Sequence, residues 1–241
     1  MLLDYADYYS LILLVPFGLM ELGWPARRYE AVRGWRLRAL AVSLAVFGVS
    51  PAVGRLWGIL LPQWSLVDGA ALGTWGGALA GILAYEFLHY WYHRAAHGWD
   101  WLWRLGHQMH HSAESLDVFG AYYLHPVDAA LFTSWAVLAF YPLLGLSPEA
   151  GAIAGAFLAF NAAFQHANIR TPAWLGYLVQ RPESHAIHHG RGIHRHNYAD
   201  LPLWDIVFGT FRNGRGGPSQ AGFYHGASAR LGAMLAFRKV T

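Results

Sequence analysis

The sequence contains no cysteine. This absence excludes disulfides, thiolate zinc sites, cysteine-ligated iron–sulfur clusters and cysteine nucleophiles together. Charged residues are also scarce, at 13% of the 241 residues, whereas 55% are hydrophobic. A typical soluble domain has about 25% charged residues. The composition therefore predicts an integral membrane protein, and because it does not change abruptly along the chain, we expect one membrane domain over residues 1–241.

Several motifs of other enzyme classes are missing as well. No HExxH sequence is present, which disfavours a zinc-dependent membrane protease. No GxGxxG run indicates a dinucleotide site, and the HPGG motif of a cytochrome b5 domain is absent because His125-Pro126 is followed by Val127-Asp128. Any redox chemistry therefore needs electrons from another protein. The basic residues form no recognisable nucleic-acid-binding motif, so we expect no nucleic-acid partner.

Histidine, in contrast, is abundant, and eight of the 14 histidines fall into three groups with helical spacing. Residues separated by three or four positions share one face of a helix, and imidazole is the commonest protein ligand for transition metals. Eight ligands are too many for one tetrahedral zinc. The pattern therefore predicts an all-histidine site for two metal ions, formed by His93 and His97, by His107, His110 and His111, and by His185, His188 and His189.

Neutral imidazoles do not by themselves distinguish iron from zinc or copper. A purely hydrolytic site with two metals would more often contain bridging carboxylates. We expect some of the nearby carboxylates instead to accept a hydrogen bond from the second ring nitrogen of a ligand histidine. The candidates are Glu86, Asp100, Glu114, Asp117, Glu183, Asp200 and Asp205.

Five apolar stretches are predicted to cross the membrane as helices, although some are near the lower length limit for a span. They cover residues 8–26, 39–61, 69–92, 129–146 and 150–165. Pro51 is expected to kink the second helix, and the GALAG run in the third should permit close helix packing. The predicted fold is an all-α membrane bundle of about four to five spans with a histidine-rich helical cap.

The charge distribution predicts how this bundle is oriented. With five crossings, every lysine and arginine except Arg55 falls on the side that carries the three histidine groups. Cytoplasmic loops are enriched in these residues. We therefore expect a multi-pass protein whose histidine site lies on the cytoplasmic side.

Five segments in a fixed order resemble the fatty acid hydroxylase and sterol desaturase superfamily. They are EFLHYWYHRAAH, LWRLGHQMHHSAE, FQHAN, RPESHAIHH and NYADLPLWDIVFGT, and the resemblance covers roughly residues 80–212. Members are integral membrane di-iron enzymes that use O2 and two electrons to hydroxylate or desaturate lipids. The resemblance implies that the eight histidines named above are metal ligands, and that a further ligand, for which we choose His166, comes from the helix before the last histidine group.

The function that the resemblance implies is hydroxylation of a C–H bond in a fatty acyl, sterol or related lipid, with O2 and two iron ions, for which zinc is a possible substitute. A lipid desaturase or an ether-lipid monooxygenase would use the same ligands. The electrons would come from an external ferredoxin, rubredoxin, cytochrome b5 or reductase. In a different class, a membrane metal transporter or metal-binding protein would also need histidines, but transport favours ionisable residues in the middle of spans.

The remaining histidines receive other roles. We expect His89 to be a hydrogen-bonding partner within its helix, and His194 and His196 to shield or support the site. Either His89 or His194 could also bind metal. His125 is expected to stabilise a turn, and His225 to be structural. The substrate, the position oxidised, the choice between hydroxylation and desaturation, the electron donor and the oligomeric state stay open.

Overall fold

A computed structural model of the protein describes residues 3–61, 64–214 and 216–241, with side chains from residue 12 onward. Arg215, one of the basic residues predicted to lie on the cytoplasmic side, lies outside the described residues. All regular secondary structure among the described residues is helical, and the only β pairing there is an isolated bridge between Gly190 and Ala221. The prediction of an all-α fold is confirmed.

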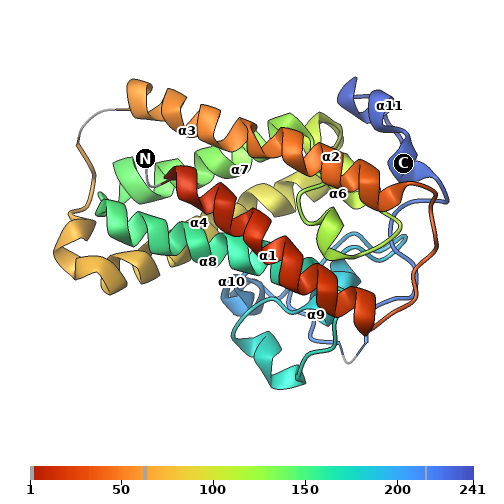
Figure 1. Ribbon diagram of the computed structural model, residues 1–241. Coiled ribbons are helices and arrows are strands. Elements are labelled where there is room, and N and C mark those ends of the chain that lie inside the picture. Colours follow the sequence, from red (N-terminus) through yellow and green to blue (C-terminus); the bar gives the residue numbers. More distant parts are fainter. Residues whose placement is uncertain (1–2, 62–63, 215) are drawn as a thin grey trace.

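Five rods form the bundle, and each runs between the same two ends of the molecule (Figure 1). Helix α8 packs against α1 and α4, while α7 packs against α3. Successive rods alternate in direction, so the connections after the first, third and fifth rods meet at one end. The rods are α1 (Leu3–Gly23), α2 with α3 (Trp35–Phe47 and Val49–Leu60), η1 with α4 (Gly69–Leu72 and Gly73–Gly98), α7 with η4 (Pro126–Leu138 and Ala139–Leu143), and α8 (Pro148–His166).

Short elements form a cap at the end where α1, α4 and α8 finish (Figure 1). Between α4 and α7 lie α5 (Asp100–Leu102), the π-helical turn η2 (Trp103–His107), α6 (Gln108–His111) and η3 (Val118–Gly120). After α8 lie η5 (Ala173–Tyr177), α9 (Pro182–His188), α10 (Pro202–Val207), η6 (Ala227–Ala229) and α11 (Leu231–Leu235).

Prolines and capping residues set the helix boundaries. The second rod is interrupted at Gly48, three residues before Pro51, because a proline has no N–H to donate to the carbonyl four residues earlier. A bend of the rod at Pro51 stays a prediction. Helices α7 and α8 both begin with proline, and the side chains of His125 and Ser147 cap them by accepting hydrogen bonds from Val127 N–H and Ala150 N–H.

Small residues let α4 approach its neighbours closely, as the GALAG run predicted. A methyl group added at Gly77 would lie 3.0 Å from Ala150 Cβ, and one at Gly81 would lie 2.7 Å from Leu146 Cδ1. The core beside them contains Ala78, with Tyr85, Phe140 and Ala154 also buried. Close packing here holds α4 in a fixed position, and the last turns of α4 carry the first histidines.

Three stretches are long and apolar enough to cross a membrane by length and composition, namely Trp35–Leu60, Gly69–Gly98 and Pro126–Leu143. The apolar part of α1 found among the described residues, Ile12–Gly23, is shorter. Large apolar side chains face outward on the rods, including Ile59 at 81% exposure and Trp75 at 77%. A membrane-embedded helical bundle explains this surface, and spanning by α1 and α8 stays a prediction.

Candidate metal centre

All nine histidines predicted as ligands lie together at the cap end of the bundle, where five elements bring them from distant parts of the chain. Helix α4 carries two of them in its last two turns, η2 and α6 carry three, the end of α8 carries His166, and α9 with the next residue carries three. They form two groups, in each of which the ligand atoms lie within 4.8 Å of one another. The five-histidine group contains His93, His97, His107, His111 and His188, and the four-histidine group contains His110, His166, His185 and His189.

Each HxxHH segment contributes to both groups, in opposite ways. In the first segment, His107 and His111 enter the five-histidine group and His110 enters the other. In the second segment, His188 enters the five-histidine group, whereas His185 and His189 enter the four-histidine group. A helix turns about 100° per residue, so residue i+4 lies about 40° to one side of residue i and residue i+3 lies about 60° to the other side. The two groups are therefore built from interlocking helical turns.

The ring nitrogens converge at short distances. In the four-histidine group, His166 Nε2 lies 3.1 Å from both His110 Nε2 and His185 Nε2, and His185 Nε2 lies 3.0 Å from His189 Nε2. In the five-histidine group, the Nε2 atoms of His107 and His111 are 3.1 Å apart. Two nitrogens bound at right angles to one ion, with bonds of ~2.1 Å, would be ~3.0 Å apart. The spacing fits nitrogens that share a metal ion.

The outer nitrogens of three rings fix the direction of their lone pairs. The Nδ1 atoms of His93 and His188 lie 2.7 Å from the carbonyl oxygens of Tyr198 and His196, and His166 Nδ1 lies 2.8 Å from Ala162 O. These oxygens can only accept, so Nδ1 carries the hydrogen and Nε2 has a free lone pair. Buried Nε2 atoms of His93 and His188 have no hydrogen-bond partner among the described residues. A bound cation would satisfy them.

Burial keeps the imidazoles outside the spans neutral. The pKa values of His110, His111, His185, His188 and His189 lie well below the ordinary range, first because burial disfavours the charged ring and then because each faces other histidines. Neutral imidazole is the metal-binding form. These residues fit a metal centre in donor type, protonation and spacing.

A carboxylate that the sequence analysis did not select orients His107. Asp128 Oδ2 lies 2.9 Å from His107 Nδ1, its other oxygen accepts a hydrogen bond from the Tyr92 hydroxyl, and its side chain is fully buried. A metal-bound histidine commonly donates its other N–H to a carboxylate in this way. Gly106 makes the approach possible, since an added Cβ would lie 2.8 Å from Asp128 Cβ. Gly106, next to His107, is the feature of the sequence that could have indicated this close contact.

The seven carboxylates chosen by their closeness in sequence do not have the predicted role, and that prediction was wrong. Among the described residues, none of them is hydrogen-bonded to one of the nine histidines. Most of these carboxylates hold backbone or neighbouring side chains instead: Asp205 accepts from Tyr198 N–H and Ala199 N–H, and Asp117 accepts from Trp35 Nε1. Glu86 and Asp200 approach a different histidine, His89, at 3.9 Å and 4.0 Å.

The other histidines divide into supporting and peripheral positions. His194 Nδ1 lies 3.1 Å from His111 Nδ1, and burial lowers the pKa of His194 to about 4, so a neutral ring supports the centre as expected. His89 stacks on His93 with ring centroids 5.3 Å apart. His125 caps α7, as the turn prediction required, and His225 pairs with Glu30 at the surface.

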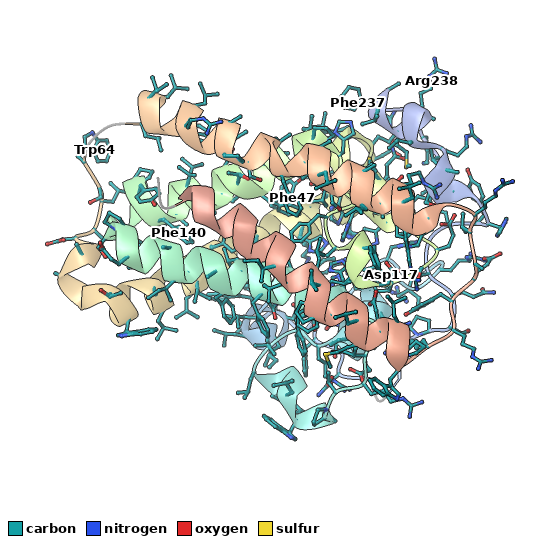
Figure 2. All side chains as sticks on the ribbon, in the orientation of Figure 1. Phe47, Trp64, Asp117, Phe140, Phe237 and Arg238 are labelled. Carbon is teal, nitrogen blue, oxygen red and sulfur yellow. The ribbon has the colours of Figure 1, made fainter. Side chains whose placement is uncertain are left out.

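A mainly apolar cavity of about 220 Å³ leads from the bundle to the histidines. Its walls come from α2 and α3, α4, α7 with η4, and α8. Figure 2 labels two of its aromatic lining residues, Phe140 within the bundle and Phe47 closer to the cap. His93, His107 and His110 line the same cavity. A lipid chain could therefore lie between the rods with one of its carbons next to the centre.

Fold and site together define a helical membrane protein with a buried, histidine-rich cluster that can hold metal ions at the end of an apolar cavity. The chain belongs to the fatty acid hydroxylase family, whose model matches residues 78–210. This agrees with the extent of the resemblance found in the sequence. The match includes all nine histidines and Asp128, and it confirms the predicted membership.

Relatives with known names are lipid-modifying enzymes. The chain is 36% identical over 146 residues to alkylglycerol monooxygenase from Homo sapiens, a match that covers 57% of this chain and 30% of that protein. It is 33% identical over 138 residues to the ornithine lipid hydroxylase OlsE from Rhizobium tropici, covering 55% of this chain and 41% of the relative. For sphinganine C4-monooxygenase 1 from Arabidopsis thaliana the identity is 25% over 134 residues, with 54% and 52% covered.

These matches span only part of the relatives, and less than a third of the alkylglycerol monooxygenases. No solved structure is significantly similar to the chain.

Proposed function

We propose that this chain is a membrane oxygenase that holds two iron ions in its histidine groups and hydroxylates a C–H bond of a lipid. The observation that carries the proposal is the apolar cavity that ends at nine histidines, eight of them buried and five of them on its wall. Membership of the fatty acid hydroxylase family and relatives named as lipid hydroxylases and monooxygenases support this reaction class.

The balanced reaction consumes O2, two electrons and two protons, and gives one alcohol and one water. When bound, the two ions would supply O2 activation and one-electron chemistry that no amino-acid side chain provides. The protein supplies the ligands, holds them by outer hydrogen bonds such as that from His107 to Asp128, and excludes bulk water from a mainly apolar cavity.

The cavity walls would orient the substrate. Phe140 and Leu158 line the part formed by the rods, whereas His110 and His166 line the cap end. A lipid chain lying along this path would present a C–H bond to the centre while the apolar wall fixes its direction. Positioning of this kind raises the rate by holding the reacting atoms close together.

The electrons would arrive from a separate carrier at the cytoplasmic face. Nitrogen-tipped side chains gather at the cap end, near the labelled Arg238 (Figure 2), and Arg28, Arg33 and Arg36 are exposed there. Positive charge at this end favours the cytoplasmic orientation and an acidic redox protein such as a ferredoxin. Turnover that falls as ionic strength rises, at saturating lipid, would support this docking mode, and turnover independent of salt would contradict it.

A more specific candidate is oxygenation of an ether lipid. The alkylglycerol monooxygenases of Homo sapiens and Danio rerio are 36% and 34% identical to this chain over the matched region. A hydroxylase for amide-linked or ester-linked acyl chains would use the same ligand set. Parallel assays with an alkylglycerol and with its acyl counterpart of equal length separate the two candidates, since only the correct class gives a product.

The test of the whole proposal is metal content together with O2-dependent product formation. Detergent-purified protein from iron-57 medium is expected to hold about two irons per chain by elemental analysis and Mössbauer spectroscopy. Replacing one histidine in each group, with His110→Ala and His188→Ala, should remove the iron and the activity.

The matched control is His125→Ala, which alters a buried histidine outside both groups. Iron retained by the control but lost from the double variant supports the proposal. Stoichiometric zinc without iron after iron-replete expression would contradict it and favour a hydrolytic, transport or structural role.

A further inference from the structure

A third group of polar side chains lies beside the histidine centre, on the wall of the cavity. It consists of Glu86 and His89 from α4 together with Asp200 from the segment before α10. One ligand atom of each lies within 4.8 Å of the others, and the three residues are 0%, 6% and 6% exposed. His89 and Asp200 line the cavity. None of these residues belongs to the two histidine groups.

The group contains two buried carboxylates without a basic partner. Among the described residues, no lysine or arginine forms an ion pair with Glu86 or Asp200, and only His89 approaches them. Backbone N–H groups of Asp200 and Leu201 donate to Glu86 Oε2, and Gln165 Nε2 donates to Asp200 Oδ1. These bonds fix both carboxylates in place but leave their negative charges uncompensated. Burying charge in this way is costly unless a cation or a proton neutralises it.

Unsatisfied atoms and their distances favour a cation. His89 Nδ1 and Glu86 Oε1 are buried and have no hydrogen-bond partner among the described residues. His89 Nδ1 lies 3.9 Å from Glu86 Oε2 and 4.0 Å from Asp200 Oδ1, which is too long for a hydrogen bond. Two atoms bound to one ion by bonds of ~2.1 Å lie between ~3.0 Å and ~4.2 Å apart, according to their angle at the ion.

We propose that Glu86, His89 and Asp200 form a third cation site, separate from the nine-histidine centre. Its donors, two carboxylate oxygens and one imidazole nitrogen, suit a first-row divalent cation such as Mn2+ or Fe2+. The buried amide oxygen of Gln165, which also has no partner among the described residues, is available as a further oxygen ligand. An ion here would tie α4 to the segment that contains Tyr198, whose carbonyl oxygen accepts from His93.

The test counts bound Mn2+ on iron-replete, detergent-purified full-length protein by equilibrium dialysis and elemental analysis. The wild type is expected to hold one divalent ion per chain more than Glu86→Gln or Asp200→Asn. Asp117→Asn is the matched control, because it neutralises a buried carboxylate that is hydrogen-bonded elsewhere. It should bind as many ions as the wild type.

Equal metal content in the wild type and both variants would overturn the proposal. A carboxylic-acid infrared band in the wild type that disappears in Glu86→Gln would also overturn it, because a proton would then neutralise the pair. The measured quantity is a difference between variants, so it does not depend on how many ions the histidines hold. His110→Ala with His188→Ala should keep the extra Mn2+ even if the proposed oxygenase function fails.

Discussion

Replacing Asp128 with asparagine should loosen the five-histidine group while leaving the four-histidine group intact. The buried carboxylate accepts from both His107 Nδ1 and the Tyr92 hydroxyl. An amide of the same shape offers one acceptor oxygen and one N–H donor. If that oxygen accepts the hydrogen bond from Tyr92, the amide N–H of the asparagine faces His107. His107 Nδ1 must then accept this hydrogen bond, so the ring proton moves to Nε2, the nitrogen that faces the metal.

The expected loss follows from this change of tautomer. Removing an outer partner of a ligand histidine weakens metal binding about 10- to 100-fold, equivalent to ~1.4 to ~2.7 kcal/mol. Competition with a calibrated chelator, followed by Mössbauer spectroscopy of the remaining iron-57, should show one iron population released earlier than the other. Adding Tyr92→Phe removes the competing donor, so the double variant should regain part of the affinity.

Wild-type affinity for both ions in Asp128→Asn would refute the reasoning. Equal weakening of both ions would also refute it, because Asp128 contacts a histidine of the five-histidine group only. Asp117→Asn provides the control for general effects of neutralising a buried carboxylate, and it should bind iron as the wild type does.

Three further predictions concern the other group, the cavity and pH. His166→Ala leaves three ligands in the four-histidine group, so iron content should fall by one ion per chain by elemental analysis, and an unchanged content would exclude His166 as a ligand. Ala136→Phe narrows the cavity and should shift products towards shorter lipid chains in a mass-spectrometric assay; an unchanged chain-length profile would show that the substrate lies elsewhere. For metal-free protein, unfolded histidines bind protons below about pH 6.5, whereas burial lowers the pKa of folded His194 to about 4 and holds those of His110 and His188 well below the ordinary range. Stability should therefore fall as pH decreases below about 6.5, by up to ~1.4 kcal/mol per pH unit for each such histidine, and urea midpoints that stay constant between about pH 7 and pH 5 would contradict this.

The helices and the three histidine segments could be predicted from the sequence because both depend on local periodicity. The spacing within HxxHH places its members on neighbouring faces of one turn wherever that turn is located. His166 was selected through the family resemblance, and its ring lies 3.1 Å from His110. How the nine residues divide between two groups could not be read from the spacing alone, because the division depends on how α6 and α9 face each other.

The partner of His107 could not be predicted in the same way. Asp128 follows it by 21 residues and reaches it only because α7 packs against η2 at Gly106. Carboxylates chosen by closeness in sequence, such as Asp117, turned out to bind backbone or side chains of other elements. Contacts between elements depend on tertiary packing, for which a single sequence gives little information.

Each HxxHH segment supplies histidines to both groups. This shared construction determines when the histidine cluster can be completed during synthesis. His111 and His189 stack with ring centroids 4.1 Å apart, one from each segment. Neither group is complete until α9 has left the ribosome and docked onto α6, by which time the preceding apolar rods have already been made. Metal insertion would therefore be a late event in biogenesis, and a ribosome-stalled chain that ends before His185 should enter the membrane without a complete histidine cluster.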